Sequence, residues 1–268
     1  MEDENFIRVK TSSPAGDLIS YLAGMKKLSK DKGKKIIIYQ RLNLIGIGFV
    51  GAKHPFQDKD GYDICMPQSM FDMLYPLIKS QDYIEDFIVY NGQEIEMDMD
   101  KCRMEIYTNQ PHGSLNRWFF HVYPEMNCDL SKEWISVSSG TLHIDKIIIN
   151  ITDRYRNYII NYFFLKKYQD KILFAGTQDE YNRFCEQWGV DVKYLEVNNF
   201  LELAIAIKSC KFFLGNQSFC FQLAESMKVP RILEISPHLP NVIPIGENAY
   251  DFYHQSELEY YFEKLALS

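Results

Sequence analysis

The sequence predicts an α/β protein of two Rossmann-like domains, each built on a doubly wound parallel sheet. A strand, a helix and a second strand follow one another over residues 5–40. A longer alternation of apolar runs and helical segments begins near residue 145 and continues to the end of the chain. The 268 residues are 46% hydrophobic, which is enough for two small cores. Because the pattern restarts near residue 145, we expect a boundary near residue 140 and domains over 1–140 and 141–268.

The amino-terminal domain opens with a strand–helix–strand unit. Its helix is expected over residues 18–33, because apolar residues recur at helical spacing from Leu18 to Leu28. Runs rich in β-branched residues predict parallel strands on either side, at 5–11 and 34–40. The rest of this domain is less regular, with a helix expected at 67–80 and a strand at 85–91.

The carboxy-terminal domain is expected to alternate strands and helices throughout, as a parallel sheet requires. Ligands of such sheets bind beyond the carboxyl ends of the strands, and with two domains we expect a central cleft. The expected strands are 145–152, 171–177, 192–197, 211–216 and 231–235, and the expected helices are 155–169, 178–189, 199–210, a segment following 218, and 256–268.

Composition and charge narrow the class of protein. The formal net charge of −7 and the isoelectric point of about 5.4 do not favour a general nucleic-acid-binding role. The chain starts with MEDENF, which is unlike a secretory signal, and no apolar run reaches the roughly 20 residues of a membrane span. We therefore expect a cytoplasmic protein without a transmembrane segment. Its six cysteines form no CxxC pair, so reduced, mostly buried thiols are expected instead of a zinc site or disulfides.

The stretch GIGFVG at residues 46–51 matches the glycine pattern of dinucleotide-binding loops. That pattern should follow its strand directly and open a helix. Here RLNLI separates it from the preceding strand, and the following AKHPFQDKDG is not helical. We interpret it as an ordinary glycine-rich loop, and a nicotinamide-dependent dehydrogenase is not expected.

The segment SSPAGDLISYL at residues 12–22 has the expected order of strand, small-residue loop and helix. Gly16 permits a close backbone approach. Asp17 lies at the expected helix start, where an aspartate most often serves as the N-cap. The functional alternative makes Asp17 a general base. Local sequence favours the cap and leaves both interpretations open.

The stretch NITDRYRNY at residues 150–158 follows the first strand of the second domain. Thr152, Arg154 and Arg156 cluster at the carboxyl end of that strand. Arginine suits bidentate contact with phosphate, and hydroxyl groups assist. A solvated helix start with surface arginines is the structural alternative, and local sequence does not decide between the two.

The stretch GNQSFCFQLAES at residues 215–226 combines a loop of small and amide residues with a helix start, where free N–H groups favour anions. The absent side chain of Gly215 would let a ligand approach, and Glu225 lies about two turns into the helix. A carboxylate there can accept hydrogen bonds from ribose hydroxyls, although a lone glutamate is usually solvent-facing. The hydrogen-bonding side chains of the loop are Asn216, Gln217 and Ser218.

Two of these motifs resemble one family. The stretch RVKTSSPAGDLISYLAGMKKL at 8–28 resembles the amino-terminal motif of the ADP-heptose:lipopolysaccharide heptosyltransferases, members of glycosyltransferase family 9. The stretch FFLGNQSFCFQLAESMKVPRILEI at 212–235 resembles their carboxy-terminal donor motif. The resemblance implies the GT-B fold, in which two Rossmann-like domains face a central cleft. It also implies sugar transfer from a nucleoside-diphosphate sugar to a hydroxyl acceptor on a glycan, a lipid or another molecule.

The resemblance also implies roles for individual residues. Asp17 takes the place of the proposed base that activates the acceptor, and Ser13 and Gly16 belong to the same acceptor loop. Glu225 resembles the helix glutamate that many GT-B enzymes use on the donor ribose or sugar. The positions that the resemblance assigns to the donor diphosphate are Thr152, Arg154, Arg156, Gly215, Asn216, Gln217 and Ser218.

The family analogy implies an inverting reaction that needs neither a metal nor a cofactor. The stretch DMD at 98–100 has the spacing of a cation site, but we interpret it as part of an acidic, exposed segment. Peripheral contact with a membrane is compatible with a lipid-linked acceptor.

This chain also departs from the family pattern. Asn216 stands where the family has an acid, Phe221 where it has histidine, and Ser218 where it has glycine. ADP-, UDP- and GDP-sugars therefore all stay open as donors. The alternatives are a catalytically silent GT-B scaffold, a nucleotide-sugar epimerase of the same fold, and an unrelated α/β protein that binds nucleotides or phosphosugars.

Overall fold

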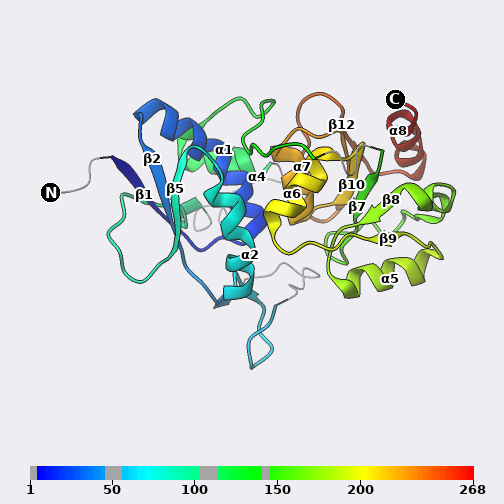
Figure 1. The fold of residues 1–268 in the computed structure, drawn as a ribbon, viewed down its shortest axis with the longest axis horizontal. Helices are drawn as coiled ribbons and strands as arrows, with labels where there is room; N and C mark the ends of the chain where they lie inside the picture. Colours follow the sequence, from blue (N-terminus) through cyan, green and yellow to red (C-terminus); the bar gives the residue numbers. More distant parts are fainter. Residues whose placement is uncertain (1–4, 46–55, 103–113, 141–144) are drawn as a thin grey trace. The chain divides into compact units, whose positions relative to one another are not determined.

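The computed structural model describes residues 5–45, 56–102, 114–140 and 145–268 (Figure 1). The chain forms two compact units. Unit 1 comprises Met1–Asp129, Trp134–Ser136 and Asn199–Leu201, and unit 2 comprises Leu130–Glu133, Val137–Asn198 and Glu202–Ser268.

Unit 1 is built on a four-stranded sheet with the order β5-β2-β1-β6, in which every neighbouring pair is parallel. The chain lays strands outward from β1 in one direction and then returns to place β6 on its other side. The topological switch point of this sheet therefore lies between β1 and β6. The strands are β1 (Phe6–Thr11), β2 (Lys35–Gln40), β5 (Ile84–Val89) and β6 (Met97–Asp98).

Three α-helices in the described part of unit 1 pack around this sheet. They are α1 (Ala15–Lys32), α2 (Gln68–Lys79) and α4 (Leu115–Val122), and the 3-10 helix η1 (Pro124–Met126) follows α4. Helices α1 and α4 meet through the rings of Tyr21 and Phe119, which stack with centroids 4.5 Å apart. Trp134 closes the same core by donating its indole N–H to the carbonyl of Ile19 at 2.8 Å. The long α1 starts directly after β1, so the β1–α1 loop is short and lies at the switch point.

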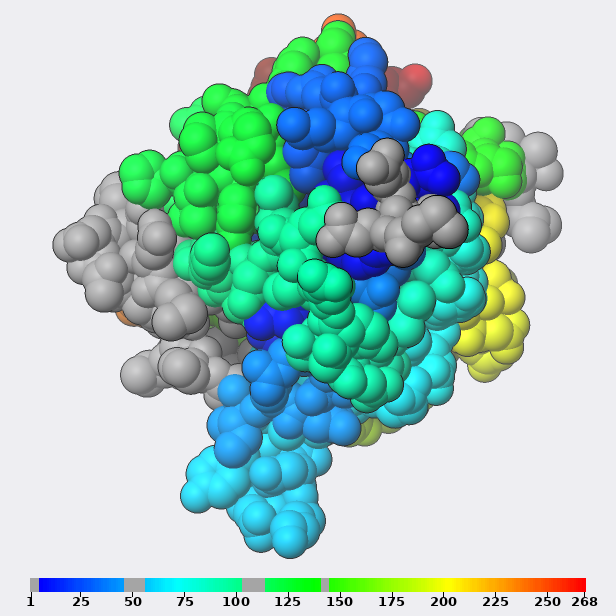
Figure 2. Space-filling view, turned by 90° about the vertical axis from the view of Figure 1, so that its left-hand side faces the viewer, coloured from blue at the N-terminus to red at the C-terminus, as the bar shows by residue number. Residues whose placement is uncertain are grey.

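A small antiparallel pair, β3 (Leu44–Ile45) and β4 (Ile64–Cys65), belongs to a segment that projects from unit 1 (Figure 2). The carboxylate of Asp58 organises its turn by accepting hydrogen bonds from the amides of Asp60 and Tyr62, both at 2.9 Å. Gly61 has φ of +83°, a conformation that glycine adopts without strain. The GIGFVG stretch lies outside the described residues.

Unit 2 is built on a six-stranded sheet with the order β12-β11-β10-β7-β8-β9, and all neighbouring strands are parallel. Read along the chain this is the Rossmann order 3-2-1-4-5-6, with the switch point between β7 and β10. All residues of the central strands β7, β10 and β11 are buried, because both faces of the sheet are covered. The strands are β7 (Ile147–Asn150), β8 (Ile172–Phe174), β9 (Lys193–Tyr194), β10 (Phe212–Asn216), β11 (Arg231–Glu234) and β12 (Ala249–Phe252).

The doubly wound parallel sheet predicted for the second half is confirmed, and helices connect most of its strands. The first of them begins with a capping box in which Thr177 and Glu180 bond each other's backbone amides. Gly189 ends that helix at φ of +59°, as the sequence predicts. The α-helices are α5 (Gln178–Trp188), α6 (Phe200–Ser209), α7 (Phe219–Ser226) and α8 (Gln255–Leu267).

The helix predicted over residues 155–169 is wrong. Residues 151–162 run without regular structure, and the 3-10 helix η2 (Phe163–Lys171) follows. Tertiary hydrogen bonds replace helical ones in this stretch: the side-chain amide of Asn157 donates to the carbonyl of Tyr253, and the amide of Asn161 donates to Gln255. Tyr253 directly follows β12, and Gln255 is the first residue of α8. The strand β12 at the edge of the sheet was not predicted.

Candidate functional site at the switch point of unit 2

Two loops meet where the sheet of unit 2 changes direction. One follows β7 and carries Thr152 and Arg154, and the other follows Asn216, the last residue of β10, and carries Ser218. The strands are direct neighbours, with Gly215 in register with Asn150. Ligands of doubly wound sheets bind outside the carboxyl ends of the strands at this point, so these loops form the candidate site.

Asn216 joins the two loops with its whole side-chain amide. Its Oδ1 accepts from the backbone amide of Thr152 at 3.0 Å and from the Thr152 hydroxyl at 3.3 Å. Its Nδ2 donates to the carbonyls of Thr152 at 2.9 Å and Arg154 at 2.6 Å. The side chain is fully buried. Asn216 was expected to contact the diphosphate. In this structure its side chain is used to hold the loop after β7.

The helix α7 begins at this junction. Ser218 is its N-cap, and the serine hydroxyl accepts from the amide of Phe221 at 3.2 Å. Gln217 lies partly exposed beside it. The first turn of such a helix presents N–H groups and the positive end of the helix dipole, which favours an anion here.

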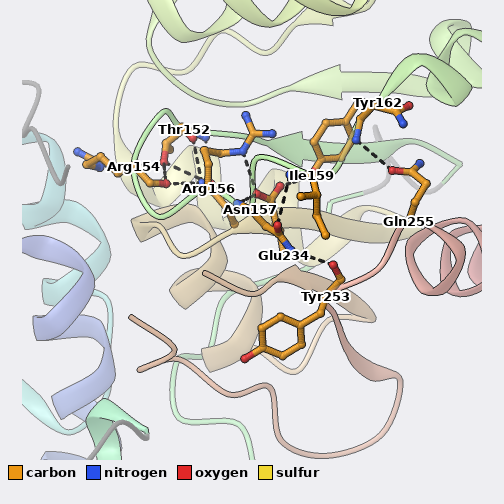
Figure 3. A network of polar contacts seen from close by, with 11 residues as sticks. Thr152, Arg154, Arg156, Asn157, Ile159, Tyr162, Glu234, Tyr253 and Gln255 are labelled. Carbon is orange, nitrogen blue, oxygen red and sulfur yellow. Dashed lines mark hydrogen bonds and ion pairs between the residues drawn. The ribbon is translucent and has the colours of Figure 1, made fainter. Parts of the chain in front are cut away.

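Arg154 supplies a cation to the same place. Its side chain is half-buried, and Figure 3 shows it extending to the opposite side of the loop from Arg156. Burial raises the pKa of the Cys220 thiol in the first turn of α7 to about 12, with Glu180 adding to the rise and Arg154 opposing it. Cys220 is therefore a neutral thiol and not a nucleophile, and Arg154 is close enough to α7 to influence it.

Arg156 turns to a different partner. Its Nε donates to Glu234 at 2.9 Å, and its guanidinium lies over the ring of Tyr162, 5.5 Å from the centroid. The hydroxyl of Tyr162 donates to the other oxygen of Glu234, and burial raises the pKa of Tyr162 well above its ordinary value, which keeps that donor protonated (Figure 3). None of these contacts supports the expected diphosphate role of Arg156.

Glu225 is buried, which overturns the solvent-facing alternative. Its side chain is 3% exposed, and its carboxylate pairs with Arg231 and Lys228. The amide of Ile245 also donates to it, at 3.3 Å. Arg231 is itself fully buried and donates to the carbonyls of Val229 and Ile245. These contacts tie the end of α7 to the segment before β12, and contact of Glu225 with a donor sugar stays a prediction.

Packing gives a reason for glycine at position 215 that is separate from the expected approach of a ligand. A Cβ at this position would lie 2.7 Å from the ring of Phe213 and 2.9 Å from the carbonyl oxygen of Asn150. Because that oxygen belongs to the neighbouring strand β7, glycine is required for β10 to pack at this point.

In unit 1 the β1–α1 loop also lies at a switch point. Ser13 is fully buried, with its amide donating to the Thr11 hydroxyl and its carbonyl accepting from Gln40. Asp17 is the third residue of α1, and the N-cap position belongs to Pro14, so the N-cap interpretation of Asp17 is wrong. Gly16 is the second residue of the same helix. The base role of Asp17 stays a prediction.

The stretch DMD lies at the same switch point and not in an exposed segment. Lys10 pairs with Asp98 at 2.7 Å and with Asp100 at 3.6 Å. Asp100 also accepts from the amide of Ser12 at 2.7 Å. Both carboxylates thus hold the end of β1, a role that sequence analysis missed. The signal that was available is the Lys10 that precedes the loop, since a partly buried lysine needs an acidic partner.

The described residues contain no group of three or more His, Cys, Asp or Glu side chains placed to hold a metal ion. None of the helices in the described part of the chain is long and apolar enough to cross a membrane. All six cysteines are free thiols.

Comparison with known proteins places this architecture in a class. No protein-family model matches the chain, and no curated protein matches it in sequence. Solved structures do match: the GT-B fold that the sequence predicts is the fold shared with glycosyltransferases, and the resemblance to family 9 is confirmed at the level of the fold.

Three solved structures define the likeness. A glycosyl transferase of family 9 from Veillonella parvula is 12% identical, with a TM-score of 0.57 over 98% of this chain and 90% of that one. The E. coli heptosyltransferase WaaC with ADP-2-deoxy-2-fluoro heptose is 9% identical, with a TM-score of 0.59 over 97% of this chain and 99% of that one. The iron-containing dodecameric glycosyltransferase TibC from enterotoxigenic E. coli is 10% identical, with a TM-score of 0.54 over 95% of this chain and 63% of that one.

Proposed function

We propose that the protein is a glycosyltransferase that moves a sugar from a nucleoside-diphosphate sugar to a hydroxyl acceptor. One observation carries the proposal. The loops after β7 and β10 are joined through Asn216 at the switch point of a six-stranded Rossmann sheet, beside the start of α7 and Arg154. The fold neighbour WaaC, which is described with an ADP-sugar analogue, has the same architecture.

In this mechanism unit 2 holds the donor diphosphate. The N–H groups at the start of α7 and the guanidinium of Arg154 stabilise the negative charge that develops as the glycosidic bond breaks. The hydroxyl of Thr152 and the loop residues Gln217 and Ser218 complete the hydrogen bonding. Because Arg154 and the helix N-terminus already provide positive charge, we propose that the reaction proceeds without a metal ion.

Asp17 is the proposed base in unit 1, where it would take the proton of the acceptor hydroxyl as that oxygen attacks the sugar. This role rests on the family resemblance. Ser13 lies in the loop before α1, Gly16 precedes Asp17 in the first turn of that helix, and Asp100 holds the amide of Ser12 in the loop.

A thermal-shift panel with ADP-, GDP-, UDP-, CDP- and dTDP-sugars and the free nucleotides tests donor binding. A ligand at about 100 times its Kd adds roughly 2.7 kcal/mol of stability, which such an assay detects readily. We expect one nucleotide to stabilise the protein, Arg154→Ala to remove the shift, and the exposed control Arg117→Ala in unit 1 to keep it. If no nucleotide shifts the transition of the folded wild-type protein, the proposal fails.

Transfer itself is tested with Asp17→Asn. The variant should bind the nucleotide as the wild type does but lose sugar transfer, and a chelator such as EDTA should leave wild-type transfer unchanged. Nucleotide binding without turnover in the wild type would instead identify a silent scaffold. Conversion of the donor sugar with no acceptor present would identify an epimerase.

A further inference from the structure

A cavity lies in unit 2 beside the loop after β7, on the side of Asp153 and Arg156. Its volume is about 250 Å³, slightly below the roughly 300–1,000 Å³ typical of drug-sized ligand sites. It opens between the irregular segment after β7 and the end of α5. Its lining residues are Asp153, Arg156, Tyr158, Ile160, Gln187 and Trp188.

One polar group that lines this cavity is an arginine with unused donors. Arg156 is 8% exposed and uses its Nε on Glu234. Figure 3 shows its outer guanidinium nitrogens turned away from Glu234. Among the described residues, neither of those two nitrogens has a hydrogen-bond partner. Both donors are therefore available to a ligand that supplies acceptor oxygens.

The side chain of Trp188 lines the same cavity. Its indole N–H is buried and makes no hydrogen bond to any described residue, so the ring offers the cavity an apolar surface. The wall is apolar where Ile160 and Trp188 form it. The carboxylate of Asp153 also lines the cavity and forms an exposed pair with Arg183 at 2.7 Å, which reduces its repulsion of an anion. Arg156 shares its charge with Glu234, so its outer nitrogens attract acceptor oxygens mainly as hydrogen-bond donors.

We propose that this cavity is a second ligand site for a small organic oxyanion, a carboxylate or a phosphate ester. The two outer nitrogens of Arg156 match the paired oxygens of such a group, and Ile160, Trp188 and the exposed ring of Tyr158 cover its carbon body. Because Arg154 and Arg156 point to opposite sides of the loop, the site is separate from the proposed donor site (Figure 3). It stands whether or not the protein transfers sugars.

The test uses protein labelled with 5-fluorotryptophan. The chain has three tryptophans, and Trp188→Phe identifies the ¹⁹F signal of Trp188. The other two, Trp118 and Trp134, lie in unit 1 and serve as internal controls. We expect saturable shifts of the Trp188 signal alone on titration with glucose 6-phosphate or benzoate, with inorganic phosphate and glucose as the headgroup-only and neutral probes. A response to the phosphates alone or to benzoate alone identifies which oxyanion binds. No saturable shift with any anion, an equal response to glucose, or equal shifts of all three signals would overturn the proposal.

Two variants on α5 locate the anion. Gln187→Glu adds a negative charge to the cavity rim and should weaken anion binding about tenfold. Asn182→Asp adds the same charge to the same helix outside the lining and should change binding little. Arg156→Lys keeps the charge beside Glu234 but removes the paired donors, so it should abolish binding while the circular dichroism spectrum is retained. If Arg156→Lys does not fold, the comparison of Gln187→Glu with Asn182→Asp tests the proposal. Equal anion binding by these two variants would show that the anion binds elsewhere and would overturn the proposal.

Discussion

Asn216 and Thr152 bond each other reciprocally at the carboxyl ends of adjacent parallel strands. The Asn216 amide accepts from the Thr152 N–H at 3.0 Å and donates to the Thr152 carbonyl at 2.9 Å. The two residues are 64 apart in the chain and both are buried. This exchange joins the two loops of the candidate site, and it explains the departure from the family acid: a carboxylate has no hydrogen to donate to the carbonyls of Thr152 and Arg154.

Asn216→Asp tests this explanation with almost no change in shape. The substituted carboxylate would face two carbonyl oxygens, so we expect a loss of about 2–3 kcal/mol in the free energy of unfolding. Nucleotide binding should weaken as well, because the loop carrying Arg154 is released. Urea titration measures the stability. The neighbouring Gln217→Glu is the matched control and should cost much less; equal costs would contradict the structural role of Asn216.

Gly215→Ala should destabilise unit 2 through overpacking. The added methyl group would meet Phe213 at 2.7 Å and the Asn150 carbonyl at 2.9 Å. We expect a cost of roughly 1–3 kcal/mol in the free energy of unfolding. Gly140→Ala is the control, since the nearest atom to its Cβ is the Ser209 hydroxyl at 3.3 Å. A stable Gly215→Ala variant that loses only nucleotide binding would favour the ligand-approach interpretation instead.

The role of Glu225 is tested by removing its ion pair in two ways. Glu225→Gln leaves the buried Arg231 uncompensated and should cost about 3–5 kcal/mol. The double variant Glu225→Met, Arg231→Met removes both charges and should recover much of that stability, because apolar pairs often replace buried ion pairs without loss. Nucleotide binding by the double variant would mark Glu225 as structural. A stable double variant that binds no nucleotide would support contact of Glu225 with the donor.

Thiol labelling reports the burial around α7. Burial raises the pKa of Cys210 and of Cys220 from the ordinary 9.0 to about 12. Iodoacetamide at pH 8 followed by peptide mapping should therefore modify the half-buried Cys128 and Cys185 first. Labelling of Cys220 as fast as Cys128 would show that the start of α7 is open.

The same two thiols predict a loss of stability in alkali. A group whose pKa is raised on folding contributes stability that is complete below its unfolded pKa and disappears as the pH rises through its folded pKa. For Cys210 and Cys220 that window runs from pH 9 to about 12. The free energy of unfolding of the wild type should fall over this range more steeply than that of a Cys210→Ala, Cys220→Ala variant. Parallel pH profiles would contradict this assignment.

The spacing of apolar residues and the positions of glycine in the sequence predicted much of the architecture. The helix around Leu18 to Leu28 and the helix ended by Gly189 follow from apolar spacing and a glycine stop, which are local properties of the chain. The helix predicted over residues 155–169 is wrong because the aromatic and apolar residues satisfy the helical pattern, whereas Asn157 and Asn161 form hydrogen bonds with residues near β12. A local pattern contains no information on partners about 95 residues away.

The sequence by itself determined the alternation of strands and helices, the placement of both motifs at strand ends, and the resemblance that names a fold. Only the tertiary structure decided what each polar side chain contacts. It turned Arg154 and Arg156 to opposite sides of their loop, paired Arg156 with Glu234, enclosed Glu225 with Arg231, and placed Asp100 against the β1–α1 loop. The reason is that burial and hydrogen bonding of a charge depend on elements brought together by the sheet order, which residue spacing along the chain does not encode.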